Sequence, residues 1–259
     1  MSPPTGDGPR IALVTGASGG LGRAIAERLA ADGDHVVLAA RRADELEAAA
    51  QAIRAAGGRA DTVVLDVTDR EGVEHAVAGI CERHGRLDVL VNNAGHNIRQ
   101  PAEDVDLGTF EQLLRLLLVA PFHLAQQVAV PMRAQGFGRI VNIGSVAASR
   151  ALPTGVAYAS AKAGLEQMTR VLAREWGPLG ITVNVVAPWY VPTPLTEGVL
   201  ARPAFRQAVL DATPAGRLGT PAEVAAAVAF LAGPEAGWIN GVVLPLDGGF
   251  SAASFFPPS

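Results

Sequence analysis

The sequence predicts an α/β fold in which helices cover both faces of one doubly wound parallel sheet of seven strands. Short apolar runs alternate with longer amphipathic segments along most of the 259 residues. The short runs are continuously apolar rather than alternating, which indicates strands buried on both faces. Strand–helix alternation is typical of a parallel sheet with helices on both sides.

Each element is predicted from its own hydrophobic pattern. The predicted strands are Ile11–Thr15, Val36–Ala39, Thr62–Leu65, Leu87–Val91, Arg139–Ile143, Thr182–Val186 and Val242–Leu246. The predicted helices are Leu21–Ala31, Ala43–Ala56, Glu71–Arg83, Leu107–Met132, Val156–Trp176 and Pro221–Leu231. No linker-like change of composition divides the chain, so we expect one domain over residues 1–259. Residues 1–9 predict a flexible tail, and the proline-rich residues 190–220 predict an irregular excursion that forms a lid.

Composition excludes several classes of protein. The net charge is −4 without a long run of one sign, which argues against a nucleic-acid or membrane-surface binder. The single cysteine, Cys81, excludes an intrachain disulfide, and the five histidines lack metal-ligand spacing, so we expect no metal site. The most apolar stretch, Leu113–Phe122, is too short to span a bilayer. Met1–Arg10 lacks the apolar core of a signal peptide, so we expect a soluble cytoplasmic protein.

A glycine-rich segment, Thr15–Gly22, joins the first predicted strand to the first predicted helix. Glycines allow a tight turn and the close approach of a pyrophosphate, and the following helix offers unpaired N–H groups. A glycine-rich turn alone is weak evidence, but this one stands where a dinucleotide would bind. The segment therefore favours a Rossmann-type dinucleotide-binding fold over a plain turn.

The end of the second predicted strand indicates which dinucleotide binds. An acidic residue at this place holds a ribose 2′-hydroxyl, whereas an arginine suits a 2′-phosphate. Ala40 stands at the acidic position, and Arg41 and Arg42 follow it. Charge matching thus predicts NADP(H), and the alternative is that both arginines are solvated residues of a loop.

A tyrosine and a lysine lie one helical turn apart in a predicted helix, at positions 158 and 162. The side chains of Tyr158 and Lys162 share a helix face, and an ammonium beside a phenol lowers the phenol's pKa. Such a pair can exchange a proton with an alcohol or carbonyl oxygen. Ser145, just beyond a predicted strand, could bond the same oxygen. Without this context the pair would be an ordinary surface pair, but strand ends of doubly wound sheets line the ligand crevice.

Further motifs follow in order: Asp66 after the third strand, Asn92–Gly95 after the fourth, Pro188 with Thr193, and Asp247–Gly249 near the end. With these motifs the chain resembles the short-chain dehydrogenase/reductases over nearly its whole length. Within that family it is similar to tropinone-reductase-like and 3-oxoacyl-reductase-like members.

The resemblance implies an NADP(H)-dependent oxidoreductase that interconverts a ketone and a secondary alcohol. It implies that Tyr158 is the general acid, that Ser145 orients the carbonyl, and that Lys162 also holds the nicotinamide ribose. It further implies that Asp66 bonds the adenine and Thr193 the carboxamide. The expected cofactor-binding residues are Gly16, Ser18, Gly19, Gly20, Leu21, Gly22, Arg41, Arg42, Asp66, Val67, Asn93, Ala94, Gly95, Tyr158, Lys162, Pro188, Trp189, Val191 and Thr193.

Leu117 departs from the family pattern, because many members carry an asparagine there that holds a water linking the lysine to solvent. Leucine cannot bond water, so the proton could travel another way, for instance through His96. Alternatively the enzyme is slow, or it performs a non-redox isomerisation or elimination with Tyr158. Because Ser145, Tyr158 and Lys162 are all present, we expect carbonyl reduction rather than a dinucleotide-binding scaffold without catalysis.

The expected substrate pocket is mostly apolar with a few polar groups, which favours a bulky, largely apolar ketone. Trp189 replaces the family's usual glycine and either walls the pocket or packs the lid against the core. Arg99 is interpreted as a solvated loop residue or as a partner for a substrate anion, and His96 as structural or substrate-binding. The pocket residues predicted are His96, Val146, Ala147, Leu152, Trp189, Tyr190 and Leu195.

The helices Leu107–Met132 and Val156–Trp176 carry more apolar residues than one sheet face needs. The tail from Phe250 to Ser259 is apolar as well. In the family these helices pair between subunits, so we expect a homotetramer or a homodimer.

Overall fold

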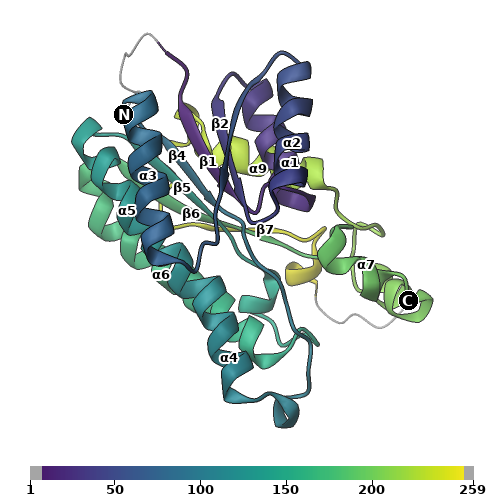
Figure 1. Ribbon diagram of the computed structural model, residues 1–259. Coiled ribbons are helices and arrows are strands. Elements are labelled where there is room, and N and C mark those ends of the chain that lie inside the picture. The colour runs from purple at the N-terminus through teal and green to yellow at the C-terminus, as the bar shows by residue number, and fades with distance from the viewer. Residues whose placement is uncertain (1–7, 254–259) are drawn as a thin grey trace.

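The computed structural model describes residues 8–253, which build the predicted sheet with helices on both faces (Figure 1). The strand order is β3-β2-β1-β4-β5-β6-β7, and every neighbouring pair is parallel. Chain order reverses between β1 and β4, where such sheets open a ligand crevice. The strands are β1 Ile11–Thr15, β2 His35–Ala40, β3 Arg59–Val64, β4 Val89–Asn92, β5 Gly138–Ile143, β6 Ile181–Pro188 and β7 Val243–Leu246.

Helices cover the sheet in two layers, with α1, α2 and α9 on one face and α3, α5 and α6 on the other (Figure 1). The helices are α1 Gly20–Ala31, α2 Ala43–Ala55, α3 Arg70–His84, α4 Leu107–Leu114, α5 Ala120–Gln135, α6 Val156–Trp176, α7 Pro194–Leu200, α8 Pro203–Asp211 and α9 Pro221–Ala232. The predicted single sheet and its helices are therefore confirmed, whereas the predicted tail residues 1–7 lie outside the described residues.

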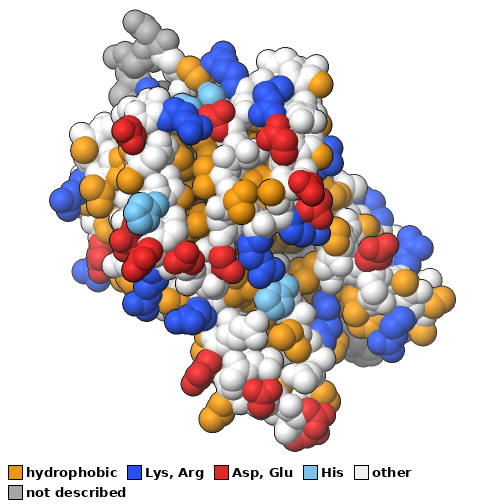
Figure 2. Space-filling view, in the orientation of Figure 1, with side chains coloured by type: hydrophobic (Ala, Val, Ile, Leu, Met, Phe, Trp, Pro, Cys, Tyr) orange, Lys and Arg blue, Asp and Glu red, His pale blue; other side chains and the backbone are white. Residues whose placement is uncertain are grey.

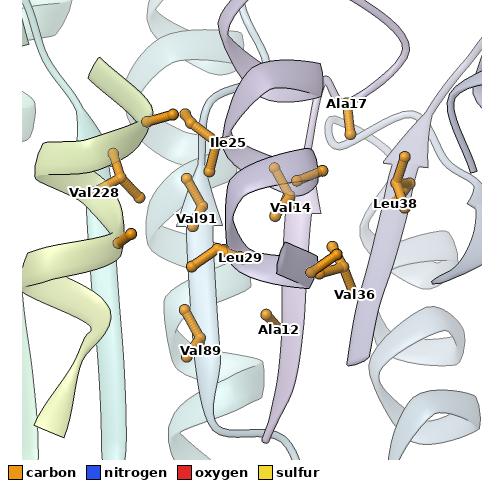
Figure 3. Packing of buried hydrophobic residues seen from close by; sticks show 14 of the residues in the cluster. Ala12, Val14, Ala17, Ile25, Leu29, Val36, Leu38, Val89, Val91 and Val228 are labelled. Atoms are coloured by element: carbon orange, nitrogen blue, oxygen red, sulfur yellow. The ribbon is translucent and has the colours of Figure 1, made fainter. Parts of the chain in front are cut away.

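The core lies on both sides of the central strands. On one face, Val14 of β1, Ile25 and Leu29 of α1 and Val228 of α9 belong to one hydrophobic cluster, in which α1 lies between β1 and α9 (Figure 3). The edge strands differ from the expected burial on both faces, because the residues of β3 and β7 are mostly half-buried or exposed. Val64 at the end of β3 is accordingly 63% exposed.

The long predicted helix is one helical stretch, Leu107–Gln135, that contains a π-helical turn at Arg115–Val119 between α4 and α5. By length and composition alone this stretch is long and apolar enough to cross a membrane, whereas the expectation concerned only the shorter run Leu113–Phe122. Its apolar character is accounted for in part by burial, because Leu113, Leu117 and Leu124 lie in the core.

The prediction that residues 190–220 are irregular is wrong in part, because α7 and α8 form there. Both helices begin with a proline, which is tolerated at the first position, where an N–H would be unpaired anyway. Thr193 precedes α7, and it forms a capping box with Thr196. The prolines therefore start helices in this segment rather than prevent them.

Charged side chains of both signs are interspersed over the face of the molecule shown in Figure 2. No large patch of one sign gathers on that face, in keeping with the low net charge. The polar groups that matter most for function lie instead inside the crevice.

Candidate active site

The glycine-rich turn between β1 and α1 forms the floor of the crevice. Gly16 and Gly20 have φ angles of 66° and 56°, a region that favours glycine. A Cβ on Gly22 would lie 2.3 Å from the carbonyl oxygen of Gly16, so α1 can approach the turn only with glycine there. Asn93 Nδ2 donates to the Thr15 carbonyl oxygen at 2.9 Å and so anchors the turn to the end of β4.

A groove of about 650 Å³ runs from this turn along the ends of β2, β3 and β4. Arg41 and Arg42 line it with side chains 72% and 64% exposed, so both guanidinium groups can reach a ligand. Arg42 Nη2 also donates to Ser18 Oγ at 3.2 Å, which links the β2 end to the turn. Hydrogen bonds from the backbone and hydroxyl of Thr68 lower the pKa of Asp66, which keeps that acceptor ionised.

The three predicted catalytic residues meet in a second pocket. α6 supplies Tyr158 and Lys162, and Ser145 follows β5. Lys162 Nζ donates to the Ile143 carbonyl oxygen at 2.7 Å and lies 5.7 Å from the centre of the Tyr158 ring. Ser145 Oγ accepts from Ala147 N at 3.2 Å, so its own hydrogen stays available for another acceptor.

Burial sets the protonation of this cluster. It raises the pKa of Tyr158, and hydrogen bonding with Ser145 opposes the rise only in part. Burial also lowers the pKa of Lys162 to about 8. The expected lowering of the phenol pKa by Lys162 is not found, and the raised pKa leaves Tyr158 a neutral phenol near neutral pH. A neutral phenol is a proton donor, which suits a general acid.

The catalytic pocket and the groove form one continuous site, because Leu21, Asn93, Gly95, His96, Thr193 and Leu195 line both. The predicted pocket residues His96, Leu152, Tyr190 and Leu195 line the same pocket as Tyr158.

Three predicted residues do not line the site. Val146 and Ala147 are 3% exposed and point into the protein, since the turn after Ser145 buries them. Gly22 does not line the groove either, because it serves the packing of α1.

One wall of the pocket is polar, whereas the sequence predicts a mostly apolar pocket. Asn97 Oδ1, Arg99 Nε and Thr154 Oγ1 are buried and have no hydrogen-bond partner among residues 8–253. All three residues line the pocket. Burial raises the pKa of the neighbouring Tyr190, and the positive charge of Arg99 opposes that rise. Arg99 is a half-buried loop residue whose Nε is shielded from solvent, so it is not the fully solvated side chain of the first interpretation.

Trp189 has both of its expected roles. It lines the pocket, and its ring stacks on Phe250 with centroids 3.9 Å apart. Its Nε1 donates to Thr213 Oγ1 at 3.1 Å, which ties the segment before α7 to the segment that follows α8. Phe250 is half-buried against Trp189, and residues 254–259 of the expected apolar tail lie outside the described residues.

Leu117 lies in the π-helical turn, is 1% exposed and lines the catalytic pocket. It packs with Ala157 and Ala161 beside Tyr158. No side-chain polar atom stands at this position to hold a water. His96 lies at the junction of pocket and groove, where burial and then Arg41 lower its pKa and favour the neutral imidazole.

The residues present fit a nicotinamide dinucleotide. The groove offers the glycine turn for a pyrophosphate and ends at the pocket that holds Tyr158 and Lys162. Pro188, Val191 and Thr193 border the junction, where a nicotinamide would lie.

The comparisons with known proteins agree with this geometry. Residues 16–251 match the family model described as enoyl-(acyl carrier protein) reductase. The chain is 38% identical to a tropinone reductase homolog of Arabidopsis thaliana, over 95% of this chain and 94% of the relative. It is 40% identical to the 3-oxoacyl-(acyl-carrier-protein) reductase of Haemophilus influenzae, over 93% and 97%.

A solved structure is similar along almost the whole chain. The gluconate 5-dehydrogenase of Burkholderia cenocepacia, in complex with NADP and tartrate, superposes with a TM-score of 0.92 at 35% identity, covering 95% of this chain and 97% of that one. The fold and site are those of an oxidoreductase that uses a nicotinamide cofactor. The chain belongs to the short-chain dehydrogenase/reductase family.

Proposed function

We propose that the protein reduces a ketone to a secondary alcohol with NADPH, or runs the reverse reaction, and that Tyr158 is the general acid/base. The observation that carries the proposal is the convergence of Ser145, Tyr158 and Lys162 on a pocket continuous with the dinucleotide groove. Arg41 and Arg42 at the far end of the groove favour NADPH over NADH.

The reaction follows from the protonation of the cluster. When bound, the reduced nicotinamide supplies a hydride to the carbonyl carbon. Ser145 Oγ donates a hydrogen bond to the carbonyl oxygen, and Tyr158 transfers its proton to that oxygen as negative charge develops. The Lys162 ammonium stabilises the resulting phenolate. Oxidation of an alcohol is the same sequence reversed, with Tyr158 as the base.

The direct test measures NADPH consumption with a panel of ketones. The panel includes cyclic ketones, 3-oxoacyl thioesters and oxo acids, and NADH is measured in parallel. We expect turnover with at least one class and a preference for NADPH. Binding of NADPH without turnover of any ketone, aldehyde or alcohol would contradict the proposal.

The polar wall of the pocket defines the substrate class further. Arg99 offers an unpartnered buried Nε next to Tyr158 and Tyr190. The Thr154 hydroxyl is an unpartnered donor or acceptor, and Asn97 Oδ1 is an unpartnered acceptor. Buried polar groups left without partners are costly, and a ligand that pairs them gains affinity. We therefore propose a substrate that combines the carbonyl with a carboxylate or another anionic group, which would accept from Arg99, and with a hydroxyl that would donate to Asn97 Oδ1. This substrate class replaces the largely apolar ketone expected from the sequence. The similar Burkholderia enzyme was crystallised with NADP and the dianion tartrate, which supports this choice.

Replacing Arg99 by glutamine is expected to raise KM for an anionic carbonyl substrate by about 10- to 100-fold, because a charged hydrogen bond contributes roughly 1.5–3 kcal/mol. The Kd for NADPH and the turnover of a neutral ketone should change little. The control variant is Arg133→Gln, because Arg133 is exposed at the end of α5. Equal losses for anionic and neutral substrates would contradict the assignment.

The pH dependence follows from the pKa of Lys162, which burial lowers to about 8. Below that pH Lys162 is an ammonium that stabilises the Tyr158 phenolate, and above it the amine is neutral. We expect kcat/KM for reduction, which reports groups of the free enzyme, to fall as pH rises through about 8. The profile is measured with enzyme verified as folded at each pH, and a flat profile across this region contradicts the role of Lys162.

A second candidate function rests on Leu117. Its apolar side chain stands beside Tyr158 and provides no water-binding group to resupply the proton. An isomerisation or elimination that returns the proton to Tyr158 within each cycle would not need that supply. Conversion of a substrate without net oxidation or reduction of the cofactor would identify this alternative.

We also propose that the chain assembles as a homotetramer or homodimer. Val119, Phe122 and Val130 on the π turn and α5 are 43%, 38% and 68% exposed, and Val156 and Val171 on α6 are 44% and 45% exposed. Apolar side chains on these two neighbouring helices provide a surface that a second copy could cover. Sedimentation at micromolar concentration tests this, and a monomer would contradict it.

A further inference from the structure

Three side chains of types that commonly bind metals meet at the end of the sheet opposite the active site. His35 begins β2, Asp61 lies in β3 and His84 ends α3. Asp61 is the register partner of Val37, which shares its sheet face with His35 two residues earlier. Val37 belongs to the hydrophobic cluster that also contains Val73 and other residues of α3. The fold therefore brings two strands and one helix to a common point.

The distances within this group are those of a ligand set. His35 Nε2 and His84 Nε2 each lie 3.2 Å from the same oxygen, Asp61 Oδ2. The potential ligand atoms of the three residues all lie within 4.8 Å of one another. Zinc with bonds of about 2.0–2.2 Å in a tetrahedron holds its ligand atoms about 3.3 Å apart. A cation could therefore bind with small shifts of these side chains.

One nitrogen of the group formed by His35, Asp61 and His84 has no hydrogen-bond partner among the described residues. His35 Nε2 is buried and lacks a hydrogen-bond partner among the described residues, because its approach to Asp61 is not aligned for a bond. A buried ring nitrogen without a partner is unusual in a native structure and calls for an explanation. The rings of His35 and His84 meet edge to face, with centroids 4.6 Å apart, so each imidazole restricts the other. A metal ion would use the nitrogen that the protein leaves unpaired.

The surroundings allow an ion to enter. The side chains of His35, Asp61 and His84 are 20%, 30% and 12% exposed. Arg83 Nη1 lies 3.5 Å from Asp61 Oδ2 and would repel a cation, but its side chain is 65% exposed and can turn into solvent. Cys81, one helical turn before His84, packs against the hydrophobic core instead of joining the group.

We propose that His35, Asp61 and His84 bind one divalent transition-metal ion, zinc above all, which fastens α3 to the β2–β3 edge of the sheet. Two imidazoles and one carboxylate are ligands that zinc accepts, and a water completes four-coordination. Tyr158 and its pocket lie at the other ends of the strands, so the expected effect of the ion is on stability. The proposal is independent of the reaction proposed above.

The test uses full-length, tag-free protein from which metal has been removed with a chelator. Zinc is titrated by calorimetry, and the melting temperature is followed with and without the ion. We expect one zinc per chain and a rise in Tm of about 5–10 °C at a hundredfold excess over Kd. Cobalt substitution should give the intense visible absorption of a four-coordinate site.

Matched variants separate this site from other zinc binding. Asp61→Asn and His84→Gln should each weaken zinc binding by about 100-fold or more and abolish the Tm rise, because loss of an outer-shell partner alone already costs 10- to 100-fold. His75→Gln is the control, since His75 is exposed on the same helix and bonds only the Glu71 carbonyl oxygen.

The zinc-dependent shift is referred to the metal-free Tm of each variant, because Asp61→Asn also removes the ion pair with Arg83. A wild-type protein without a zinc-dependent shift overturns the proposal. So does a shift of equal size in the wild type and in Asp61→Asn.

Discussion

Replacing Tyr158 by phenylalanine is expected to lower kcat for carbonyl reduction by about 10²- to 10⁴-fold, the range that a positioned general acid contributes. The substitution removes one oxygen and keeps the ring that packs beside Leu117. The fold and the groove should be unaffected, because Tyr158 lines the catalytic pocket and not the groove with Arg41 and Arg42.

The measurement pairs steady-state reduction with NADPH binding followed by fluorescence. The Kd for NADPH should stay within a few-fold of the wild type, and the melting temperature should remain close to it. The control is Tyr190→Phe, which removes the other tyrosine hydroxyl of the pocket. We expect that change to affect mainly KM. A Tyr158→Phe variant that retains more than about a tenth of the wild-type kcat would show that another group donates the proton.

The fold could be predicted from sequence because its strands and main helices repeat one local pattern. The run Ile11–Thr15 is buried throughout, and the pattern of α6 gives its bounds of Val156–Trp176 directly. The lid was harder, because a proline at position 194 or 203 predicts a helix start or a turn equally well. The capping box of Thr193 is local, but it has Thr196 where glutamate or glutamine is usual, which weakens the signal in the sequence. The packing of the two helices is not a local property.

The residues of the site could be predicted where the type of side chain determines its chemistry. They could be predicted less well where burial determines that chemistry. Ser145, Tyr158 and Lys162 were identified from type and order, yet their protonation depends on burial that the sequence does not reveal. The burial of Arg99 Nε could not be predicted from the sequence either, and for that reason Arg99 was interpreted first as a solvated loop residue. The expectation of no metal site relied on spacing along the chain, whereas His35 and His84 come from separate elements that only the fold brings together.

Replacing both Arg41 and Arg42 by alanine is expected to weaken NADPH binding by about 100-fold, while NADH binding changes by no more than a few-fold. Charged hydrogen bonds contribute roughly 1.5–3 kcal/mol each to binding. Because both arginines are exposed, we expect their combined contribution to lie near the low end, at about 3 kcal/mol. Arg41 interacts with Asp66 at 3.9 Å and Arg42 with Glu45 at 3.1 Å, so these contacts hold the guanidinium groups beside the groove.

The preference for NADPH over NADH should also depend on Ala40, the residue before Arg41. Ala40 ends β2 and lines the groove, so Ala40→Asp introduces a carboxylate where it can bond a ribose 2′-hydroxyl and repel a 2′-phosphate. In the Arg41→Ala/Arg42→Ala background this change should reverse the preference toward NADH, measured as the ratio of kcat/KM for the two cofactors. Arg54→Ala is the control, because Arg54 lies at the other end of α2 and bonds the Ala60 carbonyl oxygen. Equal losses for NADPH and NADH would mean that the arginines support the fold of the groove, and the preference for the 2′-phosphate would then need another source.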